Sequence, residues 1–402
     1  MEPDQALVEV ARDDDDGCAD VEALVGWSTA LDPAAARMRA RVSEVIRDGW
    51  MPVAAEHFRR GRFPREVFAA LGEAGAIGAG LVGEPPLSRV GTCAVMHAVE
   101  QGDGGLRCSL TIQDSVVQAL VRFGDDAQRS RWLAPLTSGR AVASFALTEP
   151  DAGSDVRAVS TRATRRGGDW VIDGEKGWIT NAGVADVILV WARSGEGNDA
   201  IRGFLIERGT PGLRIDPVGE PVAMRAAAMG RVRLDGVRVP HAALLPHAWG
   251  LTDINACLDY NRLTVIFGVM GAARACFRSA VRHARSRRQF GVPIGAKQLV
   301  QAELAEMASQ VVTGELLSLH LARRWQEAPP GRFDVSLAKR SNCRAALDVA
   351  RRSRAVLGAS GLVVDTHVAR HLLNLEASYT YGGTHEIHTL VLGRSLTGEN
   401  AF

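Results

Sequence analysis

The spacing of apolar and polar residues divides the 402-residue chain into three successive stretches. Over Asp32–Gly139 apolar residues recur at helical spacing, and Phe63-Pro64-Arg65-Glu66 is typical of a helix start with proline in its first turn. Over Ala141–Pro240 short runs rich in β-branched residues alternate with Gly-Gly, Asp-Gly and Pro-Gly dipeptides, which favour turns and hairpins. After about Leu251 the helical spacing returns.

The order helix, strand, helix predicts segregated layers and not a doubly wound βαβ sheet. We expect an α+β fold with a helical domain over residues 31–140, a central antiparallel β-domain over 141–248 and a helical domain over 249–402. Within the β-domain, Asp173-Gly174 and Asp235-Gly236 are expected to interrupt strands. Residues 1–30, which include the acidic run Asp13–Asp16, are expected to form a mobile tail.

Composition and charge exclude several classes of protein. The 47 basic and 46 acidic residues give a net charge of +1, which argues against a globally electrostatic nucleic-acid binder. No run approaches the roughly 20 uninterrupted apolar residues that a membrane span needs, so no span is expected. The six cysteines form no Cys-x-x-Cys pair and the chain starts without a basic-then-apolar signal segment, so a reducing cytoplasm is expected.

Two sequence patterns resemble catalytic motifs but lack a required part. Gly291–Lys297 is one residue short of a phosphate-binding loop, and Gln298 stands where that loop needs a magnesium-binding Ser or Thr. His385-Glu386-Ile387-His388 is one residue short of a zinc-binding His-Glu-x-x-His helix, so no metal site is expected. The chain has no Gly-x-Ser-x-Gly elbow, which argues against a serine hydrolase.

Four further segments occur in an order that is specific to one family. They are Phe145–Asp155, Lys176–Asn181, Arg287–Gly291 with Gln298, and Tyr381–His388. Together they resemble the acyl-CoA dehydrogenase family, and Asn374–Arg394 is most similar to glutaryl-CoA dehydrogenase. The resemblance implies an N-terminal helical domain, a central β-domain, a C-terminal four-helix bundle and bound FAD. It also implies a homotetramer, with a dimer as the alternative, an acyl-CoA or acyl-carrier-protein thioester, and an electron-transfer flavoprotein as acceptor if the protein dehydrogenates.

The same resemblance carries FAD-binding roles onto particular residues. Those expected to hold the isoalloxazine and ribityl chain are Phe145, Leu147, Thr148, Gly153, Ser154, Trp178 and Thr180. Those expected to reach a neighbouring subunit's FAD are Arg287, Gln289, Phe290 and Gln298, the arginine offering its fork to the pyrophosphate. Gly358, Thr384 and Glu386 complete the set. Taken alone, Trp178 and Phe290 are more typical of core aromatic residues, and only the joint occurrence of the segments favours FAD contact.

Both positions at which this family carries its catalytic base lack a carboxylate. Relatives have a glutamate directly after the tyrosine matched by Tyr381, where this chain has Gly382, and a minority have it at the position of Asn261. Neither residue can take the α-proton, so ordinary dehydrogenation loses a contribution typically worth about 10² to 10⁴ in rate. The Gly382 N–H is still expected to polarise the thioester carbonyl, as a donor of the oxyanion-hole type.

Other residues are expected to bind substrate or to supply a base. Arg107 aligns with the arginine that binds the distal carboxylate in glutaryl-CoA dehydrogenase; the alternative is a surface arginine after a glycine turn. Asp114 is a candidate substitute base, with a structural role as the alternative. The expected substrate-binding residues are Arg107, Cys108, Ser154, Tyr260, Asn261, Arg262, Tyr381, Gly382 and Gly383.

The sequence therefore predicts a FAD-dependent acyl-thioester oxidoreductase with non-standard chemistry, because the usual catalytic glutamate is absent. If Arg107 binds substrate, the substrate carries a distal anionic group. Three alternatives stay open. The first is a base-independent lyase that releases carbon dioxide or sulfite from the substrate. The second is a flavin-dependent oxygenase on the same fold, and the third is a catalytically silent acyl-thioester-binding protein.

Overall fold

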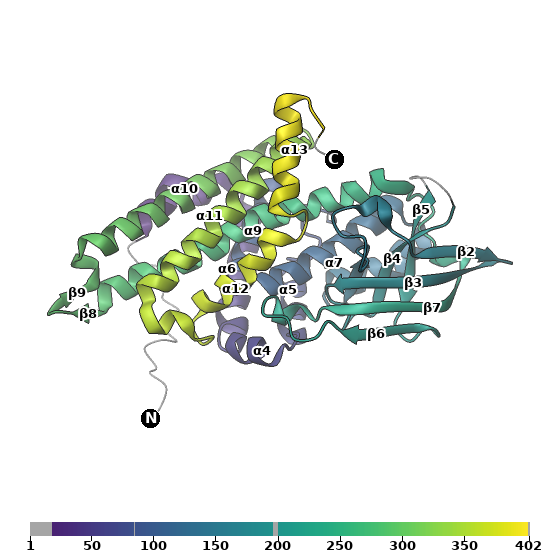
Figure 1. Ribbon diagram of the computed structural model, residues 1–402, viewed down its shortest axis with the longest axis horizontal. Helices are drawn as coiled ribbons and strands as arrows, with labels where there is room; N and C mark the ends of the chain where they lie inside the picture. The colour runs from purple at the N-terminus through teal and green to yellow at the C-terminus, as the bar shows by residue number, and fades with distance from the viewer. Residues whose placement is uncertain (1–17, 84, 196–199, 401–402) are drawn as a thin grey trace. The chain divides into compact units, whose positions relative to one another are not determined.

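The computed structural model describes residues 18–83, 85–195 and 200–400, which form two compact units (Figure 1). Unit 1 comprises Met1–Arg60, Leu87–Arg107 and Arg262–Phe402, and unit 2 comprises Gly61–Pro86 and Cys108–Asn261. The acidic run Asp13–Asp16 lies outside the described residues. The domain boundaries expected near residues 140 and 248 stay a prediction. The two compact units are divided at other places, two of which lie inside helices, after Arg107 and after Asn261.

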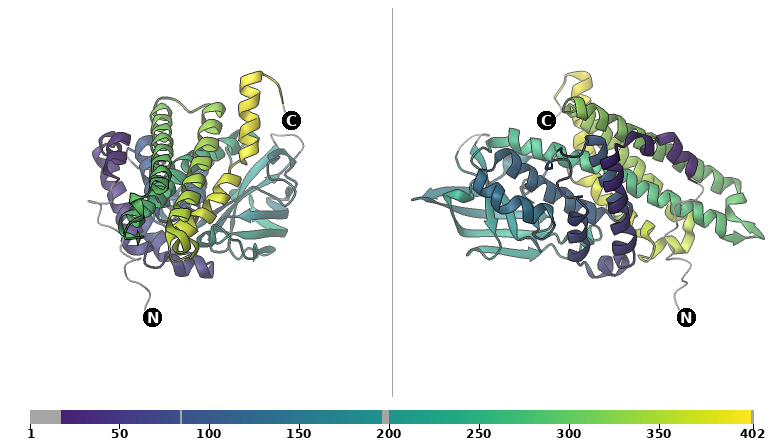
Figure 2. Two further views of the ribbon diagram at one scale, coloured as in Figure 1. Left: turned by 60° about the vertical axis from the view of Figure 1, so that its left-hand side comes forward. Right: turned by 180° about the vertical axis from the view of Figure 1, so that it is seen from behind.

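Unit 1 is a bundle of long helices with shorter helices beside it (Figures 1 and 2). Its helices are α1 (Ala19–Val25), α2 (Trp27–Ala30), α3 (Pro33–Glu44), α4 (Ala54–Arg60), α6 (Arg89–Gly102), α9 (Gly250–Ser286), α10 (Gln298–Glu327), α11 (Arg332–Leu357), α12 (His367–Thr380) and α13 (His385–Thr397). A π-helical segment, Val45–Trp50, continues α3. A short hairpin of β8 (Arg288–Gln289) and β9 (Val292–Pro293) connects α9 to α10.

The core of unit 1 combines apolar packing with one buried ionic cluster. Its apolar side chains include Phe277 of α9, Val311 of α10 and Leu375 of α12. Beside them the buried carboxylate of Glu315 accepts hydrogen bonds from Arg274 (2.5 and 2.7 Å). A carboxylate and a guanidinium that are both removed from water must be paired in this way, because either one alone carries a large desolvation cost.

The expectation of a mobile tail through residue 30 is wrong for residues 19–30. They form α1 and α2, and Trp27 is fully buried, with its indole N–H donating to the Glu315 carboxylate at 2.9 Å. Arg274 also contacts Glu22 of α1 at 2.8 Å. A buried indole and an ion pair from Glu22 fix this segment, although its acidic composition resembles a solvated tail.

Unit 2 contains a seven-stranded sheet with helices α5 (Arg65–Glu73), α7 (Gly104–Phe123) and α8 (Asp126–Thr137). Its strands are β1 (Ala143–Ala146), β2 (Arg162–Arg166), β3 (Asp169–Ile179), β4 (Val187–Arg193), β5 (Ile201–Glu207), β6 (Leu213–Pro217) and β7 (Gly230–Pro240). Their order is β1-β4-β2-β3-β7-β6, with β5 also pairing with β4. The sheet is mostly antiparallel, but β4 pairs in parallel with β1 and β2, which the hairpin signals did not predict.

Strand β4 lies between two apolar cores. Val187, Leu189 and Trp191 pack with α7 and α8 on one face of the sheet, whereas Ile188 and Val190 pack on the other face. Side chains alternate between the two faces of a strand, so a strand that is buried on both faces reads as a continuous apolar run. The run of β-branched residues at this position in the sequence is explained by this double burial.

Two Asp-Gly dipeptides lie inside long strands and do not form the expected interruptions. Asp173-Gly174 in β3 and Asp235-Gly236 in β7 face each other at a shift in register. Gly236 has a φ of 58° and its N–H donates to the Asp173 carboxylate at 2.7 Å. The dipeptides thus form a β-bulge, which uses the same left-handed glycine conformation as a hairpin turn.

The α+β fold class is confirmed, with helical regions on either side of the β-sheet region along the chain. Helix α9 is long and apolar enough to cross a membrane by length and composition alone. However, 83% of its most apolar window is buried inside the protein, as in a core helix.

Candidate active site

The loop between α12 and α13 in unit 1 is the centre of the candidate site. Tyr381 ends the helix in an extended conformation, and the next two residues have left-handed backbones, with φ of 68° at Gly382 and 94° at Gly383. Glycine adopts this conformation without the steric cost that a Cβ atom imposes. The tight path between the two helices therefore depends on the glycine pair.

Three side chains hold this loop by its carbonyl groups. Arg262 of α9 donates to Gly382 O at 3.2 Å, and Lys339 of α11 donates to Gly383 O at 2.8 Å. His388 Nε2 also contacts Gly382 O at 3.3 Å. Burial lowers the pKa of His388 to about 4, so the ring is neutral and its Nε2 carries the donated hydrogen.

The Gly382 N–H, in contrast, has no hydrogen-bond acceptor among the described residues. An unpaired N–H in a partly enclosed position is available to a ligand carbonyl. This geometry fits the expected polarisation of the thioester carbonyl by Gly382, which stays a prediction.

Arg107 is buried inside α7 and is not a surface arginine, so that alternative is wrong. Its Nε donates to Glu100 of α6 and one terminal nitrogen donates to the Tyr381 hydroxyl, both at 2.5 Å. The Tyr381 hydroxyl also lies 3.0 Å from Ser378 Oγ. Burial raises the pKa of Glu100 against the opposing effect of Arg107. The chain thus places a guanidinium and a phenol in contact, directly beside Gly382.

The approach of α9 to this group depends on Gly268. A Cβ at that position would lie 2.1 Å from Glu100 Oε2 and 2.8 Å from Arg107 Nε, so a larger residue would displace the ion pair. One oxygen of Glu100 also has no partner among the described residues. Helix packing therefore encloses the Arg107–Glu100 pair tightly.

Asp114 and its neighbours form a separate polar cluster, within unit 2. Asp114 accepts hydrogen bonds from Gly78 N–H (2.7 Å) and the Tyr260 hydroxyl (3.1 Å). Burial raises its pKa to about 7, although both hydrogen bonds oppose the rise. Ser115 and Asn261 lie side by side, 2.5 Å apart through their side-chain oxygens. Both oxygens of Asp114 are occupied, which agrees with a structural role more closely than with that of a base.

The expected FAD-binding residues of unit 2 lie along β1, β3 and the loop after β1. Phe145, Leu147 and Thr180 are buried, Thr148 is half-buried, and Gly153, Ser154 and Trp178 are exposed. Cys108 lies 3.7 Å from Thr180 through its sulfur. The loop is held by the buried Glu149, which contacts Lys176 of β3 at 2.8 Å. Burial raises the pKa of Glu149, but Lys176 and two hydroxyl groups outweigh it and hold the value at about 2.

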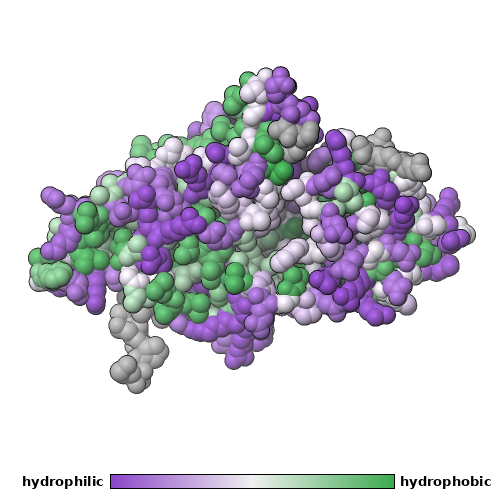
Figure 3. Space-filling view, in the orientation of Figure 1, coloured by the Kyte–Doolittle hydropathy of each residue, from purple (hydrophilic) through white to green (hydrophobic). Residues whose placement is uncertain are grey.

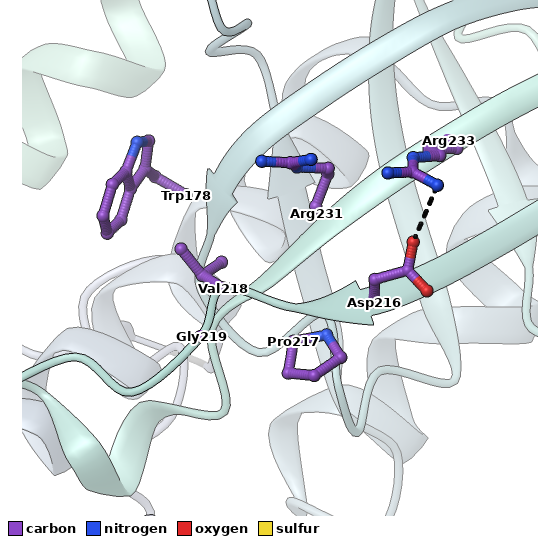
Figure 4. Close-up of a pocket in the computed structure, with 7 residues that line it drawn as sticks. All are labelled: Trp178, Asp216, Pro217, Val218, Gly219, Arg231 and Arg233. Carbon is purple, nitrogen blue, oxygen red and sulfur yellow. Dashed lines mark ion pairs between the residues drawn. The ribbon is translucent and has the colours of Figure 1, made fainter.

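Trp178 is 63% exposed and lines an open pocket of about 570 Å³ together with Val218 and Arg231 (Figure 4). At the other side of this pocket Arg233 pairs with Asp216 at 3.4 Å. Trp178 has a φ of 59°, a left-handed conformation that is uncommon for a residue with a side chain. Such strain recurs at functional sites, and an exposed indole held in this way fits contact with a flat ring.

The expected FAD-binding residues of unit 1 lie at the β8–β9 end, where Figure 3 shows hydrophobic surface. Arg287, Gln289, Phe290 and Gln298 are all exposed there. Phe290 is 94% exposed at a φ of 53°, and it lines a largely apolar pocket of about 820 Å³ with Leu299, which is 84% exposed. The core-aromatic alternative for Trp178 and Phe290 is therefore wrong.

The remaining expected FAD contacts have mixed local roles. Gly358 follows α11 with a φ of 59° and is exposed. Thr384 caps α13, since its hydroxyl accepts from Ile387 N–H at 3.2 Å. Glu386 is exposed in the first turn of α13. Among the described residues no group of three or more His, Cys, Asp or Glu side chains is arranged to hold a metal ion.

Family models for the three parts of one enzyme family match nearly the whole chain. The acyl-CoA dehydrogenase N-terminal domain matches residues 32–140, the middle domain 144–237 and the C-terminal domain 249–397. The chain belongs to the acyl-CoA dehydrogenase family. Members of this family are flavoenzymes that bind FAD.

Solved and curated relatives of this acyl-CoA dehydrogenase family member include several glutaryl-CoA dehydrogenases. One from Mycobacterium smegmatis is 41% identical with a TM-score of 0.91, over 95% of this chain and 99% of that one. A second from the same organism, in complex with FADH2, is 35% identical with a TM-score of 0.90, over 93% and 97%. Glutaryl-CoA dehydrogenase of Desulfococcus multivorans is 31% identical over 310 residues, covering 76% of this chain and 79% of that protein.

Sequence reasoning missed three residues of the site. Glu100 precedes Arg107 by seven positions, which would place both on one face of a continuous helix. The helix is interrupted at Asp103, between α6 and α7, so this spacing did not predict their contact. Lys339 belongs to no motif, and His388 stood out only in the incomplete zinc pattern and the family segment; their roles here were missed because their contacts are with backbone carbonyls more than 5 residues away in sequence. The rarity of lysine, three in the whole chain, was the one available signal for Lys339.

Proposed function

We propose that the protein is a FAD-dependent acyl-thioester oxidoreductase that acts on a substrate with an anionic distal group. One observation carries the proposal. Two guanidinium groups lie at the Tyr381–Gly383 loop, where Arg107 donates to the Tyr381 hydroxyl and Arg262 donates to Gly382 O. The positive charge of these two guanidinium groups beside the loop favours a negatively charged substrate or enolate.

FAD would supply a hydride acceptor when bound. In unit 2 we assign the isoalloxazine and ribityl contacts to Phe145, Leu147, Thr148, Gly153, Ser154, Trp178 and Thr180. The exposed indole of Trp178 in a strained backbone supports this assignment. In unit 1 we assign contacts with a neighbouring subunit's FAD to Arg287, Gln289, Phe290 and Gln298, and further FAD contacts to Gly358, Thr384 and Glu386. The exposed apolar pocket around Phe290 supports a homo-oligomer, for which we propose a tetramer.

The chain's own groups would prepare the thioester for reaction. We assign the thioester carbonyl to the Gly382 N–H, which has no other acceptor among the described residues. Arg262, Lys339 and His388 fix that N–H by holding the loop carbonyls. A rigid donor aimed at the developing oxyanion stabilises the enolate without reorganisation during the reaction.

Arg107 and Tyr381 would bind the distal anionic group. The guanidinium is fixed by Glu100 and points one nitrogen at the Tyr381 hydroxyl. We assign further substrate contacts to Arg262 and Gly383 in unit 1 and, separately, to Cys108, Ser154, Tyr260 and Asn261 in unit 2. The acyl group is carried on CoA or on an acyl carrier protein, and an electron-transfer flavoprotein would accept the electrons.

A base-independent lyase is the second candidate, favoured by the same arginine beside a loop without a carboxylate. If carbon dioxide left from the α-carbon or from a carbon conjugated with the thioester, the electron pair of the broken bond would form the enolate and no base would be needed. We place the protein in the cytoplasm, and the six cysteines, which are buried and form no disulfide, support this location.

The FAD-loaded protein tests the proposal with matched thioesters. Glutaryl-CoA is expected to reduce the flavin anaerobically with a kcat/KM at least about tenfold above that of butyryl-CoA, because one charge-assisted contact is worth about 1.5–3 kcal/mol. Arg107→Gln should remove this preference. Release of carbon dioxide without flavin reduction would favour the lyase, and no reaction with either thioester would contradict both.

A further inference from the structure

The position where relatives carry their catalytic side chain is bordered in this protein by a lysine. A Cβ added at Gly382 would meet one described heavy atom within 4 Å, Lys339 Cε at 3.5 Å. Lys339 lies on α11 and is 1% exposed. Both residues belong to unit 1. The space next to Gly382 therefore lies beside the end of an ionisable side chain.

The hydrogen bonds of Lys339 match those of a neutral amine. Its Nζ donates to Gly383 O at 2.8 Å and to Ser378 O at 3.3 Å, and among the described residues these are its hydrogen bonds. An ammonium has three N–H donors, so one would be unpaired in this buried place. A neutral amine has two N–H donors and a lone pair, so both donors are paired and the lone pair is available to accept a proton.

The charges around Lys339 also favour the neutral form. Buried lysines are normally paired with a carboxylate, as Lys176 is with Glu149 at 2.8 Å. Lys339 has no such pair among the described residues. The groups that act on it are Cys343 on its own helix, Arg262 on α9, Arg107 on α7, and His385 and His388 on α13. Burial is the largest effect and lowers the pKa of Lys339. The positive charges of Arg262 and Arg107 lower it further, whereas Cys343 raises it.

We propose that Lys339 is the general base that removes the α-proton of the acyl thioester. The inference rests on the proposed function. The Nζ lone pair forms an N–H bond as the α-carbon–hydrogen bond breaks, and the freed electron pair delocalises onto the thioester oxygen beside the Gly382 N–H. The amine becomes an ammonium, and bound FAD would supply the acceptor for the β-hydride. Lysines with lowered pKa serve as general bases elsewhere.

The first test measures the protonation of Lys339 directly. The chain has three lysines, so a sample labelled with [ε-¹³C]lysine gives three resonances, which Lys→Arg variants assign. The Lys339 resonance is expected to titrate below the ordinary lysine pKa of 10.5 in the FAD-loaded wild-type protein. A Lys339 pKa of 10.5 or higher would overturn the proposal. The titration is made on the wild-type protein, so it does not depend on whether a Lys339 variant folds.

The second test separates the base from a positioning role. FAD-loaded wild type, Lys339→Met and Lys339→Arg are incubated with glutaryl-CoA in D₂O, and α-hydrogen exchange and thioester binding are measured on the same samples. Arginine keeps the donors to Gly383 and Ser378 but stays protonated, so both variants should bind thioester and lose exchange by about 10² to 10⁴. Arg340→Met, which removes a cation one residue away, is the matched control and should exchange like wild type.

The outcomes distinguish failure of this inference from failure of the proposed function. Exchange that persists in Lys339→Arg would show that the lysine only holds the loop, and would overturn the base assignment alone. Wild type that binds thioester without exchanging its α-hydrogens would also overturn it. Wild type that binds neither FAD nor any thioester would overturn the proposed function, and the base assignment with it.

Discussion

Replacing Gly382 by glutamate tests whether the space beside Lys339 is where the α-proton is removed. Gly382 has a φ of 68°, and a residue with a Cβ in the left-handed region costs about 1–2 kcal/mol. The contact that the Cβ would make, 3.5 Å to Lys339 Cε, is ordinary packing. Gly382→Ala carries the same backbone cost without a carboxylate, so it is the matched control. Both variants should lose stability equally, measured by thermal melting.

The rate of α-hydrogen exchange should then depend on which group, the new carboxylate or Lys339, is present to act as the base. In the Lys339→Met background, Gly382→Glu should restore α-hydrogen exchange of glutaryl-CoA by about 10² to 10⁴, which is the usual contribution of a positioned base. Gly382→Ala should restore nothing. The assay is exchange into D₂O followed by mass spectrometry.

Equal exchange by the glutamate and alanine double variants would refute this reasoning. It would mean that the α-carbon of the bound thioester does not lie beside the 382 side chain. A glutamate variant that melts far below its alanine partner would also refute it, since the backbone cost would then not be the main effect.

Three further predictions concern the described packing and charges. Glu315→Ala should destabilise the protein by about 3–5 kcal/mol, because it removes the buried carboxylate that accepts from both Arg274 and Trp27, whereas Glu303→Ala, at a half-exposed ion pair, should change melting little. Burial and neighbouring positive groups lower the pKa of His371 to about 3, below its unfolded value of 6.5. The unfolded state therefore binds more protons as the pH falls below 6.5, so melting temperature should drop towards pH 4, and less steeply in His371→Gln. Trp178→Ala and Phe290→Ala should weaken FAD binding at least several-fold, measured by flavin dissociation, while melting of the apoprotein changes little because both side chains are exposed.

The broad fold could be predicted from the sequence because each stretch has one dominant periodicity. The double burial of β4 was visible as a continuous apolar run, and the start of α5 as Pro64 before Arg65. The bulge at Asp173-Gly174 was not predictable, since a bulge and a turn use glycine in the same conformation. The ordered segment 19–30 was not predictable either, because its anchor, Glu315, lies 288 positions after Trp27.

Only part of the candidate site, likewise, could be predicted from the sequence. Short motifs located Trp178, Phe290 and Gly382, because each lies in a contiguous segment typical of the family. The surroundings of Gly382 come from separate helices, with Arg262 on α9 and Lys339 on α11. Only the fold brings such residues together, and burial, which lowers the pKa of Lys339, cannot be read from neighbouring sequence.

The most direct test of the account is the anaerobic reaction of the FAD-loaded protein with glutaryl-CoA, followed by flavin absorbance. We expect the flavin to be reduced, at a rate that rises with pH as Lys339 loses its proton. Flavin that stays oxidised across the whole pH range, although glutaryl-CoA is bound, would contradict it.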